Sequence, residues 1–102
     1  MSAFPVIVHY HFKKGLEKEG LQHLMSVLRD KATELGGQNL GLWQSDQDPT
    51  HVMGMGWWDS LEDSNRFQAY WNSQMGQLSK YLASPPVREC YPTHISGSGN
   101  AA

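Results

Sequence analysis

Two histidines near the N-terminus could transfer protons or bind a metal. His9 and His11 stand two residues apart in an alternating segment, so in a β-strand both side chains project from one face. Imidazole changes charge near neutral pH and is a common metal ligand. A third ligand at suitable spacing is missing, with His51 the nearby candidate, and we therefore predict no metal site. The plainer interpretation is that both histidines form hydrogen bonds on a covered sheet face.

Two glycines could open a pocket for a small aromatic molecule. Within residues 51–58, Gly54, Gly56 and Trp58 alternate onto one face, so two missing side chains would leave space beside an aromatic wall. Aromatic walls with few polar groups are typical of small-molecule sites. The pattern therefore predicts a pocket on this face of the strand.

A later segment could supply the second wall of that pocket. Tyr70, Trp71 and Asn72 are consecutive in a region of helical periodicity, and a helix packed on the strand would bring them toward the glycines. Aromatic residues at helical spacing more often form a core than a site, which is the competing interpretation for Tyr70 and Trp71.

The familiar catalytic patterns are missing from the chain. There is no nucleophile beside a base, no pair of catalytic carboxylates and no phosphate-binding loop. The single cysteine, Cys90, cannot close an internal disulfide, and no nearby histidine marks it as a nucleophile. We therefore expect a buried thiol and a reducing, cytoplasmic location.

Six segments must position these residues. Alternating apolar residues predict strands over residues 5–12, 39–45, 52–58 and 87–91, and apolar stripes predict helices over residues 17–35 and from Asp59 or Ser60 to a point before Pro85. This order is the split βαβ pattern, a ferredoxin-like βαββαβ arrangement of the α+β class. It places the first and third strands at the centre of an antiparallel sheet, with two helices on one face. Because the strands carry bulky residues on both faces, we expect a second copy of the chain to cover the other face.

Composition limits the possible partners. The chain has 102 residues, 39% of them hydrophobic and 18% charged, which fits one folded domain that we assign to residues 1–95, followed by a flexible tail over residues 96–102. A formal net charge of −2 gives no general attraction to nucleic acid or to an anionic membrane. The N-terminus lacks the long apolar run of a signal peptide or membrane span. We expect neither nucleic acid nor a membrane as a partner.

Several local patterns carry a resemblance to a known family. They are Lys14-Gly15 after the first strand, the turn at residues 46–50, and the junction at residues 57–62 that leads into the second helix. With the amphipathic first helix, they make the chain resemble the antibiotic biosynthesis monooxygenase-like domains of the dimeric α+β barrel superfamily, over roughly residues 5–91. The resemblance implies a homodimer and a fold that hosts cofactor-free oxygenases, haem-degrading enzymes, isomerases and proteins without known activity.

The resemblance also suggests site residues. Relatives that oxidise anthrones have a tryptophan, a tyrosine, an asparagine and an arginine near the substrate. The matching candidates for catalysis are Trp58, Tyr70, Asn72 (or Asn65) and Arg88, and the candidates for substrate contact are Val8, Gly54, Gly56, Phe67 and Trp71. The resulting prediction is a cofactor-independent monooxygenase that acts on a small aromatic or polyketide-type substrate.

Other functions compete with this prediction. The haem-degrading relatives have an axial histidine where this chain has Lys80, which removes the usual iron ligand. An RNA-recognition module has the same element order, but residues 51–58 lack the basic residue and alternating aromatics of its signature. A non-catalytic dimeric protein that binds a small ligand, or a related isomerase or cyclase, remains as the alternative.

Overall fold

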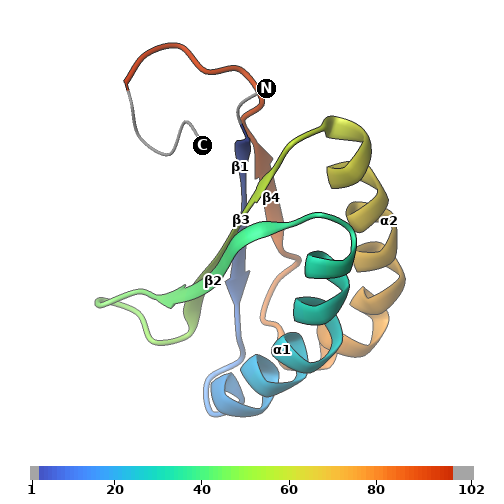
Figure 1. Cartoon of the computed structure of the whole chain (residues 1–102). Coiled ribbons are helices and arrows are strands. Elements are labelled where there is room, and N and C mark those ends of the chain that lie inside the picture. The colour runs from blue at the N-terminus through green and yellow to red at the C-terminus, as the bar shows by residue number, and fades with distance from the viewer. Residues whose placement is uncertain (1–2, 98–102) are drawn as a thin grey trace.

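The computed structural model describes residues 3–97, and the six predicted elements are confirmed there (Figure 1). The strands are β1 (Phe4–His11), β2 (Gln38–Gln44), β3 (His51–Trp58) and β4 (Val87–Cys90), and the helices are α1 (Glu17–Glu34) and α2 (Leu61–Leu78), followed by the short 3-10 helix η1 (Ser79–Tyr81). The predicted tail begins at Ser96, and its residues 98–102 lie outside the described part.

The second helix begins at a predicted cap and ends earlier than its apolar stripe suggests. The Ser60 side chain accepts a hydrogen bond from the Asp63 backbone N–H at 3.1 Å, which satisfies a free donor of the first turn. At the other end α2 stops at Leu78, whereas the sequence predicts a helix that continues toward Pro85. The reason is tertiary, because Leu82 forms an isolated β-bridge with Phe12 and must adopt an extended backbone there.

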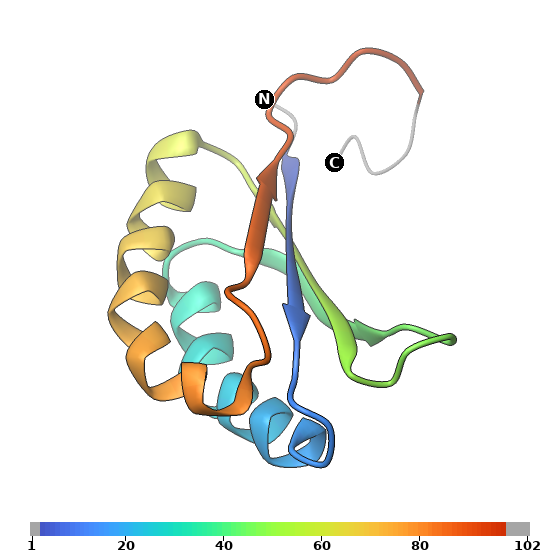
Figure 2. The same cartoon turned by 180° about the vertical axis from the view of Figure 1, so that it is seen from behind.

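The sheet has the predicted antiparallel arrangement. Its strand order is β2-β3-β1-β4, with β1 and β3 at the centre. Both helices lie on one side of this sheet, as the views from the two sides show (Figures 1 and 2). In the β1/β3 register, Val8 pairs with Gly54 and His9 pairs with Met53. The alternation read from the sequence therefore separates two faces in the structure.

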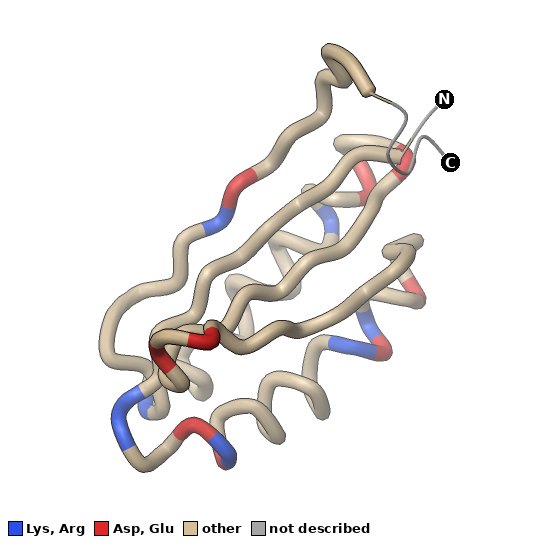
Figure 3. Tube along the Cα trace, turned by 90° about the vertical axis from the view of Figure 1, so that its left-hand side faces the viewer, with Lys and Arg blue, Asp and Glu red and all other residues tan. Residues whose placement is uncertain are grey.

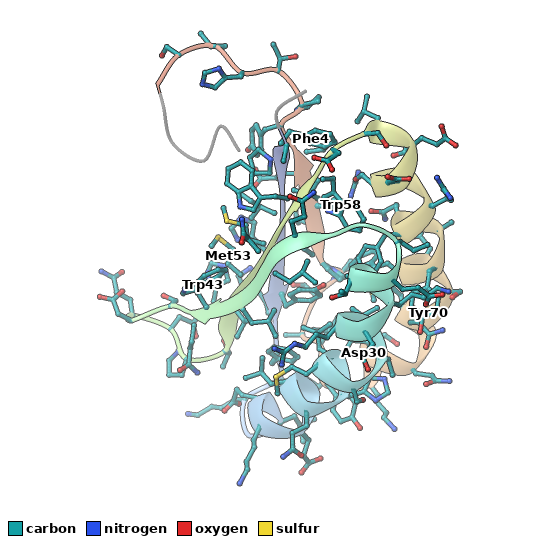
Figure 4. All side chains as sticks on the ribbon, in the orientation of Figure 1. Phe4, Asp30, Trp43, Met53, Trp58 and Tyr70 are labelled. Carbon is teal, nitrogen blue, oxygen red and sulfur yellow. The ribbon has the colours of Figure 1, made fainter. Side chains whose placement is uncertain are left out.

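The helix-covered face holds the core. Tyr10, Phe12 and Val52 are each 3% exposed or less, and they pack with Leu78 of α2 and Leu24 of α1. Figure 4 shows Trp58 projecting from the sheet toward the helices, and a second buried cluster surrounds it. This face is where apolar burial stabilises the fold.

The opposite face, which we call the open face, is covered by neither helix (Figures 1 and 2). Trp43 and Met53 project away from the helices (Figure 4). The side chains on the open face are Pro5, Ile7, His9, His11, Trp43, His51, Met53, Met55, Trp57, Val87 and Glu89. Figure 3 looks onto this face, and β1, β2 and β3 carry no Lys, Arg, Asp or Glu. In the described part of the chain, neither helix has the length and apolar character needed to span a membrane.

Candidate functional site

A cavity of about 350 Å³ lies between the sheet and the two helices. This volume is within the range typical of sites for small organic ligands. Its lining includes seven of the nine predicted site residues: Val8, Gly54, Gly56, Trp58, Phe67, Trp71 and Arg88. Strands β1, β3 and β4 and helix α2 thus bring together residues that are far apart in the sequence.

The two glycines of β3 form part of the cavity wall, but side chains of β2 partly cover them. A Cβ added at Gly56 would lie 2.7 Å from Leu40 Cδ2, and one added at Gly54 would lie 3.2 Å from Leu42 Cδ2. Both leucines come from β2, so that edge strand folds its side chains over the space that the glycines leave. The remaining volume is shaped by β2 as much as by β3.

Aromatic rings form the apolar walls. Trp58 stacks on Phe67 with ring centroids 5.4 Å apart, which joins β3 to α2. Trp71 is 7% exposed and lies one helical turn further along α2. These rings give the cavity apolar surfaces that suit a flat ligand.

Arg88 brings a positive charge to this apolar cavity. Its Nη2 donates a hydrogen bond to Ser64 Oγ at 2.8 Å, and Ser64 is 2% exposed. Among residues 3–97, no carboxylate lies within salt-bridge distance of Arg88. A guanidinium has five N–H donors, so most of them remain available to a ligand. This side chain therefore favours an anionic group in the cavity.

Tyr10 supplies a hydroxyl group that the sequence did not single out. Its oxygen accepts a hydrogen bond from the Trp71 indole N–H at 2.9 Å, which leaves the hydroxyl proton free to be donated. Burial raises the pKa of Tyr10, an effect that the Trp71 hydrogen bond only partly offsets. The hydroxyl therefore stays protonated near neutral pH and can act as a donor, but not as a base.

Two predicted catalytic residues are not part of the cavity lining. The Tyr70 hydroxyl donates to the Val27 carbonyl oxygen at 2.8 Å, so it joins α2 to α1. Asn72 is exposed, and its side-chain oxygen accepts from Gln68 Nε2 at 3.0 Å. Asn65, the other asparagine considered, is also exposed. The helix presents these side chains to solvent or to α1.

Polar residues that the sequence analysis missed reach the cavity instead. Arg29 of α1 and Gln68 of α2 line it together with Ser64. Gln68 lies four residues after Ser64 and three before Trp71, so a helical projection through Trp71 would have placed it on the cavity side of α2. No comparable signal marks Arg29, because the sequence does not show how α1 crosses the sheet.

The histidines lie on the open face, away from the cavity. His9 Nδ1 and His51 Nε2 are 3.0 Å apart, and His9 Nε2 is 3.0 Å from Glu89 Oε1. The His11 ring stacks on the His51 ring with centroids 4.4 Å apart. Across residues 3–97 no group of three or more His, Cys, Asp or Glu side chains has a geometry that could hold a metal ion. The cluster is a hydrogen-bonded chain of side chains.

Two other residues considered in the sequence lie outside both sites. Lys80 is in η1, beyond the end of α2, and its ammonium lies 5.1 Å from the centroid of the Tyr81 ring. Cys90 packs against the cluster of Phe4 and Trp58, but it is half-buried and not fully buried as the sequence predicted.

Comparisons with known proteins identify the fold. No protein-family model matches the sequence, and no curated protein matches it. Among solved structures, a candidate antibiotic biosynthesis monooxygenase from Nitrosomonas europaea superposes with a TM-score of 0.78 and 16% sequence identity, with 90% of each chain covered. Another candidate antibiotic biosynthesis monooxygenase, from Bordetella bronchiseptica, has a TM-score of 0.77 and 14% identity, over 93% of this chain and all of the other.

The fold is shared more widely than one activity. A conserved protein from Methanosarcina mazei gives a TM-score of 0.79 at 17% identity, over 92% of this chain and 95% of that one. A NIPSNAP family protein from Agrobacterium tumefaciens gives 0.68 at 23% identity, over 92% of this chain and 96% of its own. The chain thus has the ferredoxin-like α+β fold of the antibiotic biosynthesis monooxygenase-like structures, and its activity has to be argued from its own residues.

Proposed function

We propose that the chain is a cofactor-independent monooxygenase-like enzyme of the antibiotic biosynthesis monooxygenase type, acting on a small, acidic aromatic compound. The observation that carries this proposal is the Arg88 guanidinium, which faces an apolar cavity without a carboxylate partner among residues 3–97. In low-dielectric surroundings a cation strongly favours an anion beside it. The ligand that fits is an aromatic molecule with an ionised phenol or enol.

The residues around the cavity further limit the substrate class. None of the described lining residues is a histidine, aspartate or glutamate. A strong general base is therefore missing from the wall, and the substrate has to ionise easily by itself. Hydroxylated naphthalenes and anthrones meet this requirement, since delocalisation stabilises their anions.

The proposed reaction uses the substrate anion as the reductant of oxygen. An anthrone methylene and O₂ give a carbonyl and one molecule of water, through an initial proton loss from carbon and electron transfer from the resulting anion to O₂. Arg88 stabilises the anion, and Tyr10 donates a hydrogen bond to a ring oxygen. Trp58, Phe67 and Trp71 orient the rings, and Val8, Gly54 and Gly56 leave room for them.

This assignment moves the donor roles away from Tyr70 and Asn72. Their polar groups already bond to Val27 and Gln68, outside the cavity. In the proposal they stabilise the helical layer, and Arg88 with Tyr10 replaces them as the donors to substrate.

The decisive experiment compares two arginines on the same fold. Oxygen consumption with an anthrone and a dihydroxynaphthalene is measured for metal-stripped protein, for Arg88→Met, and for the control Arg66→Met, whose side chain is exposed and paired with Glu62 and Asp63. Arg88→Met should lower turnover about 100-fold, as loss of one preorganised donor does elsewhere. Arg66→Met, Tyr70→Phe and Asn72→Ala should stay within about threefold of wild type, since none removes a donor from the cavity.

Two results would contradict the proposal. Turnover that appears only after haem, flavin or metal is added would exclude a cofactor-free mechanism. Wild-type turnover in Arg88→Met would exclude the anion-stabilising role.

A binding protein without catalysis is the second candidate, favoured by the lack of a lining carboxylate or imidazole within residues 3–97. It would retain an anionic aromatic dye in the cavity with an affinity that depends on Arg88, but it would consume no oxygen with any substrate. Dye binding and oxygen consumption measured on the same preparation separate the two candidates.

We also propose that two copies associate through the open face. Ile7, Met53, Met55 and Trp57 are only partly covered within one chain, and charge is nearly missing from this face. Contiguous apolar surface of this kind usually marks a protein contact. A homodimer built on this face would cover both sheets at once.

A further inference from the structure

The histidine cluster (His9, His11, His51 and Glu89) is the one strongly polar feature of the open face. It is half-buried, with His9 and Glu89 side chains 30% and 40% exposed. It lies on the opposite side of the sheet from the cavity, and the proposed reaction does not use it. We propose that this cluster is a proton-binding site that weakens the association of two copies as the pH falls, an inference that rests on the proposed dimer.

The hydrogen-bond geometry determines how many protons the cluster can bind without losing a hydrogen bond. With Glu89 ionised, His9 Nε2–H donates to Glu89, and His9 Nδ1 then accepts from His51 Nε2–H. This series of hydrogen bonds needs no positive charge on either ring. The cluster can also take one proton on the free His51 Nδ1. The His51 Nε2–H donation to His9 is then unchanged, and the Glu89 carboxylate balances the charge.

Further protons break this arrangement. A proton on His9 Nδ1 would face the His51 Nε2–H across 3.0 Å, so the hydrogen bond between the rings would be lost. A proton on His11 would place a second cation against the stacked His51 ring, whose centroid is 4.4 Å away. Acidification is the change that adds such protons to imidazole rings.

Asp48 and Tyr91 are the other titratable groups beside the cluster, and neither prevents its protonation from disrupting the hydrogen bonds. Asp48, in the turn before β3, has a lowered pKa, chiefly from hydrogen bonds donated by Thr50 and to a smaller extent from His11 and His51. Its carboxylate is exposed and bonded to Thr50, so solvent weakens its attraction for protonated His11 and His51 without removing it. Tyr91 donates a hydrogen bond to Glu89, which raises the Tyr91 pKa and keeps that hydroxyl neutral.

A second copy would make protonation harder. Covering the face removes water that would otherwise solvate the imidazolium ions, so the free chain takes up protons more readily than the dimer. By linkage, the dimer loses stability as the pH falls. If each chain takes up one extra proton on dissociation, the dissociation constant rises by up to about 100-fold per pH unit.

Sedimentation of the full chain between pH 7.5 and 5.5 tests the inference, with circular dichroism at each pH to show that the chain stays folded. The wild-type dissociation constant should rise at least about 10-fold over this range. His51→Gln keeps a donor and an acceptor but cannot titrate, so its constant should rise less than the wild-type constant over the same range. His94→Gln, a change at an exposed histidine after β4, should respond like wild type.

The outcomes separate the switch from the dimer. A monomer at pH 7.5 would overturn the dimer and the switch together, whereas a dimer with an unchanged constant would overturn the switch alone. A full pH response in His51→Gln would also overturn it. His9→Gln is the second variant if His51→Gln does not fold, and the rate of subunit exchange between tagged and untagged copies replaces the constant if the dimer is too tight to dissociate.

Discussion

The two faces of the sheet are built from the same strands, but the charged residues on them have different partners. Arg88 and Glu89 are adjacent in β4, the only strand of the sheet with charged residues, and alternation sends them to opposite sides. On the helix side, Arg88 bonds to the neutral Ser64 hydroxyl, and no carboxylate among residues 3–97 compensates its positive charge. On the open side, Glu89 bonds to His9, whose ring can itself take up a proton.

This difference shows what each face can respond to. An uncompensated cation in an apolar cavity calls for an anion from outside the chain, which is why we propose an acidic ligand there. A carboxylate bonded to linked imidazoles already has partners, and its surroundings change with the proton concentration. One face is therefore suited to binding a ligand, and the other to an association that depends on pH.

The largest expected effect is on stability, and it compares a buried residue of the helix-covered face with an exposed residue of the open face. Phe12 is 1% exposed and Trp43 is 52% exposed. Phe12→Ala should lower the free energy of unfolding by about 3 to 5 kcal/mol, because it leaves a cavity in the core. Trp43→Ala should lower it by about 1 kcal/mol. Denaturant titration at one protein concentration checks both, and equal losses would mean that the open face contributes as much to stability as the core.

A smaller effect compares the inner and outer surfaces of the helices. A Cβ at Gly20 of α1 would overlap the Phe12 ring and lie 3.1 Å from Tyr81 Cβ, whereas one at Gly76 of α2 meets nothing within 4 Å. Gly20→Ala should destabilise by about 1 to 3 kcal/mol through overpacking. Gly76→Ala should stabilise by about 0.5 to 1 kcal/mol, since alanine favours helix. Thermal melts of the two variants should shift in opposite directions, and a shared direction would refute the close packing at Gly20.

The smallest expected change in stability tests the cavity itself. In Gly56→Leu the flexible end of Leu40 has to move, and the new side chain can then enter the cavity. We expect a stability change within about 1 kcal/mol, together with loss of binding of an anionic aromatic dye. Gly76→Leu, on the outside of α2, is the matched control and should bind dye like wild type. A loss of about 1 to 3 kcal/mol in Gly56→Leu would show that Gly56 is needed for close packing.

The sequence predicted the sheet well because alternation is a local signal. Residues 5–12 assign Tyr10 and Phe12 to one face and His9 and His11 to the other, and the structure confirms both assignments. The cavity side of β3 could be predicted for the same reason, since Gly54, Gly56 and Trp58 alternate as well.

The polar part of the cavity was harder to predict. The stripe of α2 contains both Tyr70 and Trp71, yet Tyr70 bonds to α1 while Trp71 bonds to Tyr10 of the sheet. Which edge of a stripe meets the sheet depends on the crossing angle of the helix, and the sequence of α2 does not contain that angle. Arg29 was missed for this reason, whereas Tyr10 was assigned to the correct face of β1 and only its hydrogen bond with Trp71 was not foreseen.

By itself the sequence determined the elements, their order and the two faces of each strand, because periods of two and 3.6 residues are properties of a single segment. Only the tertiary structure decided which side chains from different segments meet. It brought His51 within 3.0 Å of His9, placed Arg88 against Ser64 and covered Gly56 with Leu40. These contacts depend on strand register and on how the helices lie across the sheet, and both are set by the packing of the whole chain.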